Sequence, residues 1–267
     1  MTQTVVLITG ANRGIGHGLL TLYLARPDHI VIAAVRDPGH PTSKALATLP
    51  KAAGTELIVV KIDATISTDP VEAVKTLSDK HNLNHIDILV ANAGIALKWV
   101  KVSEVTAEDI QKHVDVNVYG FTRLFQAFVP VLQKAKQPKW VTIGSSAAFL
   151  TVSRPFVIFV PLMGSVADLV SQEMIPMKNA AYAPTKAVQH WLTKAIHIEE
   201  PWLIAFPIDP GWVQTDLGNR GADAFGYEKA AVTVDESVNG IIKVIDAATR
   251  ETHSGKMWVY KGHESQW

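Results

Sequence analysis

The sequence has no cysteine and no surplus of either charge, and each absence excludes a class of chemistry. Without cysteine the chain can form neither disulfides nor a thiol nucleophile. That composition suits a reducing compartment, and we expect a cytoplasmic protein. Lysine plus arginine equals aspartate plus glutamate, at 25 each. The net charge therefore provides no general attraction to nucleic acid or to anionic membranes.

Long apolar runs and metal-ligand clusters are also missing. The most apolar short run, RPFVIFVPLMG at residues 154–164, is too short to span a bilayer, which takes about 20 apolar residues. The N-terminal segment lacks the basic start and small-residue cleavage pattern of a secretory signal. His81 and His85 are four positions apart, but no third ligand has suitable spacing, so we expect no metal site.

Strand-like apolar runs alternate with segments of helical period along the chain. Strands are expected at 4–9, 29–35, 56–62, 86–93, 140–146, 202–209 and 256–261. A long helix is expected from Thr106, a good N-cap residue, to about Lys134. This alternation predicts a single α/β domain over residues 1–267, a doubly wound parallel sheet with helices on both faces in three αβα layers.

A glycine-rich turn, TGANRGIG at residues 9–16, follows the first expected strand and opens a helix. Gly10 would permit a tight turn, while Gly14 and Gly16 would let the backbone approach a phosphate and let the helix pack against the strand. The helix N-terminus would offer free N–H groups to a pyrophosphate. In this context the turn predicts dinucleotide binding, with an ordinary glycine-rich loop as the alternative.

The spacing of this turn, followed in order by Tyr182-x3-Lys186 and by DPGWVQTD at 209–216, resembles the short-chain dehydrogenase/reductase family. The resemblance covers nearly the whole chain and implies a Rossmann-type fold that binds a nicotinamide dinucleotide. The cofactor contacts that it implies are Gly10, Arg13, Gly14, Ile15, Gly16, Arg36, Asp63, Asn92, Gly94, Tyr182, Lys186, Pro210, Gly211, Val213 and Thr215.

The end of the second expected strand indicates which dinucleotide is bound. Relatives that bind NAD usually place an acidic residue there, whereas this chain has Arg36, and Arg13 lies inside the glycine turn. Two guanidinium groups can hold a 2′-phosphate through charge-assisted, forked hydrogen bonds. This pattern favours NADP(H). Asp37 argues the other way, and Arg36 could simply be a surface residue.

The reactive group is expected around Tyr182 and Lys186, whose four-residue spacing on a helix puts them on one face. A phenol with a pKa of about 10 is a poor acid at neutral pH, and a neighbouring ammonium would lower that pKa. The resemblance implies that Tyr182 protonates a carbonyl oxygen and that Lys186 holds the nicotinamide ribose. It also implies that Ser146, chosen over Ser145, polarises that oxygen, and that Asn117 holds a water in a proton relay.

Within the family, WLIAFPIDPGWVQTDLG at 202–218 resembles the norsolorinic-acid-ketoreductase-like branch of fungal secondary metabolism and, more loosely, the sniffer-type carbonyl reductases. This implies NADPH-dependent reduction of a ketone, such as an aromatic polyketide, to an alcohol. Trp212, Phe225 and Tyr227 could stack on a flat substrate or simply pack together. Two alternatives remain: alcohol oxidation by the same residues, and a non-catalytic dinucleotide sensor. Relatives often form dimers or tetramers, which leaves a homo-oligomer open.

The segment 152–172 is an atypical insertion between the expected catalytic residues. Ser146 and Tyr182 are 36 positions apart, further than relatives need. Val152–Ser153 can be encoded by GTAAGT, a splice-donor sequence, and Gln172 by CAG, a splice acceptor. Removing these 21 residues keeps the reading frame and leaves Ser146 and Tyr182 15 positions apart. We hypothesise that the segment is a translated, retained intron.

Overall fold

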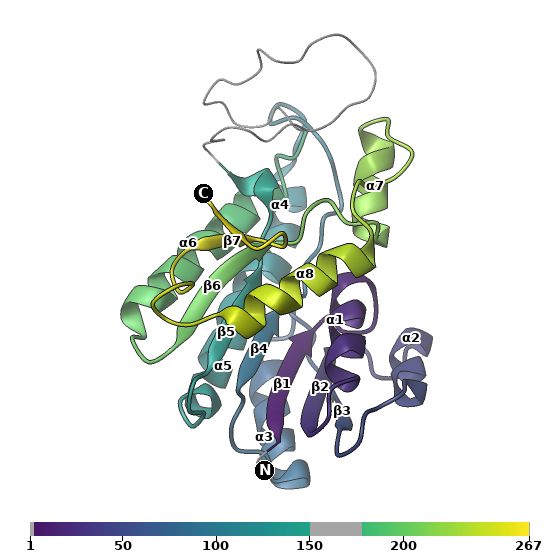
Figure 1. Ribbon diagram of the computed structural model, residues 1–267. Coiled ribbons are helices and arrows are strands. Elements are labelled where there is room, and N and C mark those ends of the chain that lie inside the picture. The colour runs from purple at the N-terminus through teal and green to yellow at the C-terminus, as the bar shows by residue number, and fades with distance from the viewer. Residues whose placement is uncertain (1–2, 150–177, 267) are drawn as a thin grey trace.

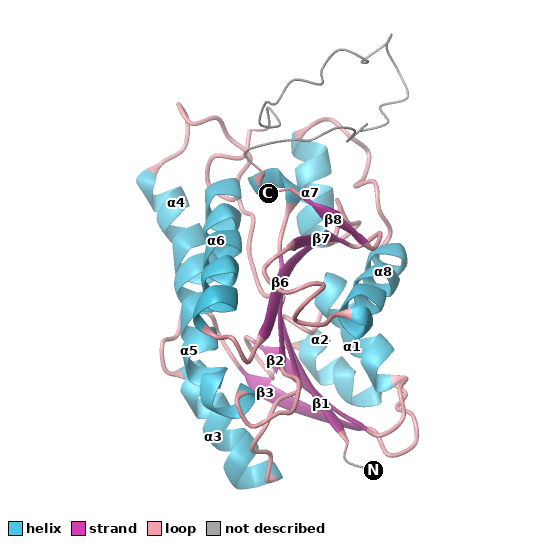
Figure 2. Ribbon diagram, turned by 60° about the vertical axis from the view of Figure 1, so that its left-hand side comes forward, coloured by secondary structure: helices cyan, strands magenta, loops and turns pink. Residues whose placement is uncertain are grey.

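The computed structural model describes residues 3–149 and 178–266. The hypothesised insertion at 152–172 lies outside the described residues. Within them, one sheet runs through the middle of the molecule and helices cover both of its faces (Figures 1 and 2). This arrangement confirms the predicted doubly wound, three-layer fold.

The sheet explains where a ligand site should form. Its strands are β1 (Thr4–Thr9), β2 (His29–Val35), β3 (Glu56–Lys61), β4 (Ile88–Ala91), β5 (Lys139–Ile143), β6 (Ile204–Asp209), β7 (Met257–Val259) and β8 (His263–Ser265). Their order is β3-β2-β1-β4-β5-β6-β7-β8. All neighbours pair in parallel except β7 and β8, which are antiparallel. The order reverses between β1 and β4, and doubly wound sheets bind ligands at such a switch point. The short strand β8 was not predicted.

The helices form two layers around this sheet. They are α1 (Gly14–Leu24), α2 (Pro41–Lys44), η1 (Ala45–Thr48), α3 (Asp69–His81), α4 (Ala107–Val114), η2 (Asp115–Gly120), α5 (Phe121–Leu132), η3 (Ser146–Ala148), α6 (Ala183–Glu199), α7 (Asp216–Ala224) and α8 (Val234–Ala247). Helices α1 and α8 cover one face, while α3, α5 and α6 cover the other (Figure 2).

The buried strands contribute alternate side chains to two core clusters, one on each face of the sheet. In β1, Val6 and Ile8 join the cluster that includes residues of α1 and α8, whereas Val5 and Leu7 join the cluster with residues of α3 and α5. Successive side chains of a strand point to opposite faces, so a strand covered on both sides is apolar throughout. This is why the strands were recognisable as continuous apolar runs.

The long helix predicted between Thr106 and Lys134 is present, but its middle is not α-helical. Thr106 caps α4 by accepting a hydrogen bond from the Asp109 N–H at 3.1 Å. Helix α4 then runs into the π-helical turn η2 and on into α5. The π turn contains Asn117. Isolated π turns inside longer helices often mark functional positions.

Two negative findings apply to the described residues. None of their helices is both long and apolar enough to cross a membrane. They also contain no group of three histidine, cysteine, aspartate or glutamate side chains placed to hold a metal. His85 instead lies 3.5 Å from a carboxylate oxygen of Asp87.

Candidate active site

The glycine turn has the backbone that its sequence predicted. Gly10 and Gly14 have φ angles of +64° and +55°, a region that favours glycine. A Cβ at Gly16 would lie 2.3 Å from the Gly10 carbonyl oxygen, so only glycine fits there. Asn92, at the end of β4, donates from Nδ2 to the Thr9 carbonyl at 2.8 Å. The turn is therefore tied to the neighbouring strand at the switch point.

The segment after β6 lies directly against this turn. A Cβ at Gly14 would be 3.1 Å from Cγ2 of Thr215. Arg13 and Asp216 approach to 3.6 Å in an exposed ion pair. Gly211 has a φ of +77°, which turns the chain after β6. Two segments predicted to bind one dinucleotide are thus side by side, although 200 positions separate them in the sequence.

The remaining predicted cofactor residues stand at the ends of their strands. Arg36 follows β2, is exposed, and makes no ion pair or hydrogen bond with the described part of the chain. Asp37 accepts a hydrogen bond from the Gly39 N–H at 2.7 Å, so its carboxylate serves a local turn. Asp63 follows β3 and accepts from the Thr65 N–H at 2.9 Å.

Three other predicted cofactor residues flank these segments. Ile15, in the first turn of α1, packs against the core cluster. Val213 pairs with Val232 in an isolated β-bridge, which fixes the segment that follows Pro210. A Cβ on Gly94, just after β4, would lie 3.8 Å from the Lys186 ammonium nitrogen. The predicted cofactor segments therefore reach the predicted catalytic lysine.

Tyr182 and Lys186 share one face at the start of α6. The Lys186 nitrogen lies 5.9 Å from the centre of the Tyr182 ring. Lys186 is buried, and its Nζ donates to the Ile143 carbonyl at 2.7 Å and to Gln189 Oε1 at 2.8 Å. An ammonium has three N–H donors, so one has no partner among residues 3–149 and 178–266 and could serve a ligand. Burial lowers the pKa of Lys186 to about 8.

The phenol of Tyr182 is hydrogen-bonded to the side chain of Ser145. Burial raises the pKa of Tyr182, the Ser145 hydrogen bond opposes that change, and the Asp209 carboxylate raises the pKa further. Burial is the largest of these effects, and the lowering of this pKa by Lys186 stays a prediction. Tyr182 is accordingly held in its protonated form.

The neighbouring serine has a different partner. The backbone N–H and the hydroxyl of Ser146 both stabilise the buried Asp209 carboxylate, whose pKa is raised by burial. Ser145 is therefore the serine in contact with Tyr182 in this structure, and the role expected for Ser146 stays a prediction. Adjacent residues leaving a strand point in opposite directions, and the doubled serine in the sequence does not reveal which of them faces α6.

Asn117 links the loop after β4 to α6. Its Nδ2 donates to the Ile95 carbonyl at 2.9 Å and to Thr185 Oγ1 at 3.0 Å, and its backbone carbonyl accepts from Gln189 Nε2 at 2.7 Å. A side-chain amide thus connects the Asn117 backbone carbonyl to Lys186. Sequence reasoning missed Gln189, although its position three residues after Lys186 puts it on the same helix face.

The aromatic residues after β6 pack on one another. The Trp212 ring centre is 6.2 Å from that of Phe225 and 5.4 Å from that of Tyr227, both close to edge-on. Tyr227 keeps 43% of its surface exposed. Trp99, from the loop after β4, packs against α7, where a Cβ on Gly221 would lie 3.2 Å from its ring nitrogen. Sequence reasoning also missed Trp99.

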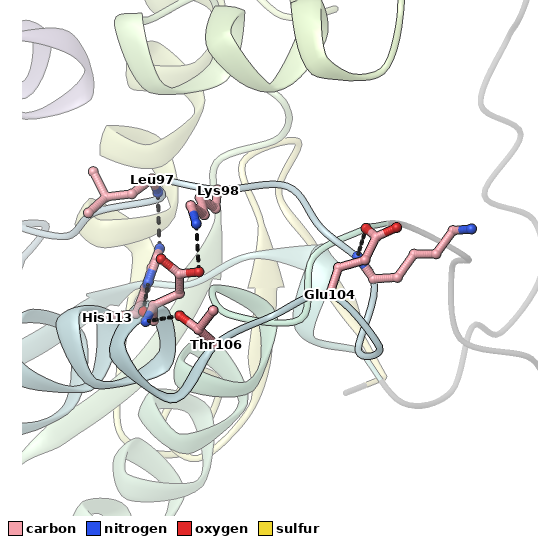
Figure 3. A network of polar contacts seen from close by, with 7 residues as sticks. Leu97, Lys98, Glu104, Thr106 and His113 are labelled. Carbon is pink, nitrogen blue, oxygen red and sulfur yellow. Dashed lines mark hydrogen bonds and ion pairs between the residues drawn. The ribbon is translucent and has the colours of Figure 1, made fainter.

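The loop after β4 is anchored to α4 by two consecutive residues, Leu97 and Lys98 (Figure 3). The buried His113 accepts the Leu97 N–H at Nε2, 3.0 Å away. Lys98 forms an ion pair with Asp109 at 2.8 Å. Further along, the Glu104 carboxylate accepts the Lys101 N–H at 3.2 Å. These contacts fix the course of the loop beside the candidate site.

Comparisons with known proteins agree with this geometry. The short chain dehydrogenase family model matches residues 4–156. Norsolorinic acid ketoreductase of Dothistroma septosporum is 40% identical over 259 residues, which cover 97% of this chain and 90% of that protein. The Aspergillus parasiticus enzyme of the same name is 36% identical over 266 residues, covering 99% and 92%.

Among solved structures, the NADPH-bound carbonyl reductase from chicken fatty liver has a TM-score of 0.77 and 26% identity, with full coverage of both chains. Carbonyl reductase Sniffer of Drosophila melanogaster has a TM-score of 0.76 at 18% identity over both full chains, which extends the likeness in fold. From its sequence match, its relatives and its fold, this chain belongs to the short-chain dehydrogenase family of oxidoreductases.

Proposed function

We propose that the protein is an NADPH-dependent ketoreductase that converts a ketone to a secondary alcohol, with Tyr182 as the general acid. The observation that carries the proposal is the contact between Tyr182 and Ser145, with Lys186 one helical turn away and close to Gly94. Relatives at 36–40% identity are named as ketoreductases. The substrate in the names of these relatives, norsolorinic acid, supports an aromatic polyketide, or a similar secondary metabolite, as the ketone.

The residues present fit a bound dinucleotide. At Gly16 the backbone leaves no room for a Cβ, which suits close approach of a pyrophosphate to the turn and to the N-terminus of α1. The guanidinium of Arg36 is exposed and has no partner among the described residues, which suits binding of a 2′-phosphate. Asp63 would lie near the adenine, and Val213 and Thr215 near the nicotinamide. When bound, NADPH supplies the hydride.

The chain's own residues handle the proton. The Ser145 hydroxyl donates to the ketone oxygen and stabilises the negative charge that develops there. Tyr182 transfers its phenolic proton to that oxygen. Because burial and Asp209 raise the pKa of Tyr182, the phenol is protonated at neutral pH, as a general acid must be. The charged Lys186 stabilises the phenolate that remains and uses its third N–H to hold a ribose hydroxyl.

The aromatic residues after β6 would contact the substrate. Trp212, Phe225 and Tyr227 present ring edges and faces close to the segment predicted to hold the nicotinamide. Such rings pack well against a flat aromatic ketone. The same residues can run the reaction toward alcohol oxidation. A non-catalytic dinucleotide sensor is less favoured, because it would have no use for the Ser145–Tyr182 contact.

The test compares NADPH consumption by wild type and by Tyr182→Phe, with an aromatic ketone as substrate. Loss of the acid should lower kcat by about 10²–10⁴-fold while NADPH affinity, measured by fluorescence, is retained. Tyr119→Phe is the matched control, because Tyr119 is 46% exposed and lies outside this cluster. Equal rates for wild type and Tyr182→Phe would remove the catalytic assignment.

A further inference from the structure

The side chain of Gln189 forms a buried bridge inside the candidate active site. It is 1% exposed. Its Oε1 accepts from Lys186 Nζ at 2.8 Å, and its Nε2 donates to the Asn117 backbone carbonyl at 2.7 Å. An amide buried without partners would be strongly destabilising. Here both of its ends are paired, so the orientation of the amide is fixed by α6 and by the π turn η2.

We propose that Gln189 is a positioning residue that keeps Lys186 in its charged form and directs its remaining N–H toward the cofactor ribose. The inference rests on the proposed function, since it concerns the same lysine. Gln189 Oε1 and the Ile143 carbonyl can only accept hydrogen bonds. Bonds from an ammonium to such acceptors are stronger than bonds from a neutral amine, so both contacts favour the charged lysine.

This stabilisation matters because the environment of Lys186 opposes its charge. Burial lowers the pKa of Lys186 to about 8. This pKa lies only slightly above neutral pH, so a small further decrease would deprotonate the ammonium. Removing one charge-stabilising acceptor should then discharge the lysine inside the working pH range. The amide group carries no acidic proton, so its contribution is to hold charge rather than to pass a proton to Asn117.

Three other ionisable groups lie around Lys186. Tyr182 and His190 lie on α6 itself, and Asp209 stands at the end of β6; β5 and η2 present the uncharged Ile143 and Asn117. Burial, with help from Lys186, lowers the pKa of His190 to about 3. Burial raises the pKa of Tyr182 and that of Asp209. The Gln189 side chain bonds Lys186 and the uncharged Asn117 carbonyl, so a change near pH 8 that depends on Gln189 reports on Lys186.

The decisive variant is Gln189→Met, which keeps the length of the side chain and removes both polar ends. We expect the basic limb of the kcat/KM profile for ketone reduction to move down by about one pH unit, the effect of losing one charge-assisted hydrogen bond. The KM for NADPH should rise about tenfold at pH 8 and much less at pH 6. Equal loss of activity at every pH would indicate a purely structural role and overturn the proposal.

A second readout needs no turnover. An unfolded lysine has a pKa of 10.5 and the folded Lys186 about 8, so the wild-type free energy of unfolding should rise with pH between those values. In Gln189→Met that rise should begin about one unit lower. An unshifted profile would overturn the proposal. If the stability profile of Gln189→Met shifts but the wild type does not reduce ketones, the role of Gln189 stands and only the ketoreductase function is contradicted.

Two further variants complete the experiment. Thr193→Val is the control: Thr193 is buried on the same helix and bonds to the Gln189 carbonyl and to Thr142, away from Lys186. It should lower stability equally at all pH values, and a shifted limb in this variant would count against the inference. If Gln189→Met does not fold, Gln189→Glu serves as the second test, because it keeps an acceptor and adds negative charge. The basic limb of its kcat/KM profile should move to higher pH. An unchanged limb would contradict the proposal.

Discussion

At the scale of single residues, the two serines after β5 contact different partners, one at the start of α6 and one at the end of β6. Ser145 bonds the phenol of Tyr182, and its backbone N–H donates to His190 Nε2 at 3.3 Å. Ser146 stabilises Asp209. A difference of one position therefore decides which hydroxyl can reach a substrate oxygen beside the phenol.

Replacing these serines one at a time should give opposite results. Ser145→Ala removes the group that polarises the ketone, and kcat should fall by about 10²–10³-fold. Ser146→Ala should keep most of the rate and lower the midpoint of thermal unfolding, because the buried Asp209 carboxylate loses a stabilising contact. Steady-state kinetics and thermal melts measure both effects. A larger kcat loss for Ser146→Ala would instead support Ser146 as the residue that polarises the ketone.

Cofactor preference should depend on Arg36. If its guanidinium binds the 2′-phosphate, Arg36→Ala should raise the KM for NADPH by about 10–100-fold, the value of one or two charge-assisted hydrogen bonds. The KM for NADH should change little, since NADH lacks that phosphate. Arg13→Ala is an informative comparison, because Arg13 already pairs with Asp216 and should matter less. Parallel losses with both cofactors would refute the role of Arg36.

At the scale of elements, the junction between β1 and α1 depends on backbone contact that no larger residue permits. Gly16→Ala would force the new Cβ to within 2.3 Å of the Gly10 carbonyl and 2.6 Å of Asn92 Nδ2. Relief of that clash should shift α1, weaken NADPH binding at least about tenfold and lower stability by about 1–3 kcal/mol. Isothermal titration with NADPH measures the first effect, and chemical unfolding the second.

Gly18→Ala is the matched control on the same helix. Its Cβ would meet side-chain atoms of Val238 and Val234, which belong to α8 and can adjust. We expect a modest change in stability with NADPH affinity retained. If Gly18→Ala weakens NADPH binding as much as Gly16→Ala does, the effect comes from general disturbance of α1 and not from the glycine turn.

The π turn is a local helix geometry that the sequence pattern did not predict, and it contains the candidate site residue Asn117. Apolar periodicity predicted one helix across this region, and the chain does stay helical from Ala107 to Leu132. The period does not reveal that residues 115–120 adopt the wider π turn. That turn carries Asn117, whose backbone carbonyl accepts the Gln189 amide, so the contact with α6 is a property of the folded element.

At the scale of the whole molecule, the buried His190 should make the fold sensitive to acid. Its pKa is lowered to about 3 from 6.5, so the unfolded chain binds the extra proton between those values and stability falls as pH drops through that range. The loss should approach about 5 kcal/mol near pH 3. His190→Asn should flatten the dependence of unfolding free energy on pH below 6.5. An equally steep profile in this variant would assign the sensitivity to other groups.

The segment 152–172 bears on what the natural polypeptide is. We propose that it is translated intron, because its ends can be encoded as splice sites and its removal keeps the frame. Sequencing the transcript tests this directly. A cDNA that lacks these 63 nucleotides as the main species is expected, and one that retains them would contradict the proposal.

The sequence by itself determined the layered fold, the glycine turn and the Tyr182–Lys186 pair, because each depends on period or on spacing within a few residues. Only the tertiary structure decided which serine meets Tyr182 and that Gln189 joins Lys186 to Asn117. Those contacts connect positions up to 72 residues apart. They depend on how α6 packs against β5 and the π turn, and no local pattern encodes that packing.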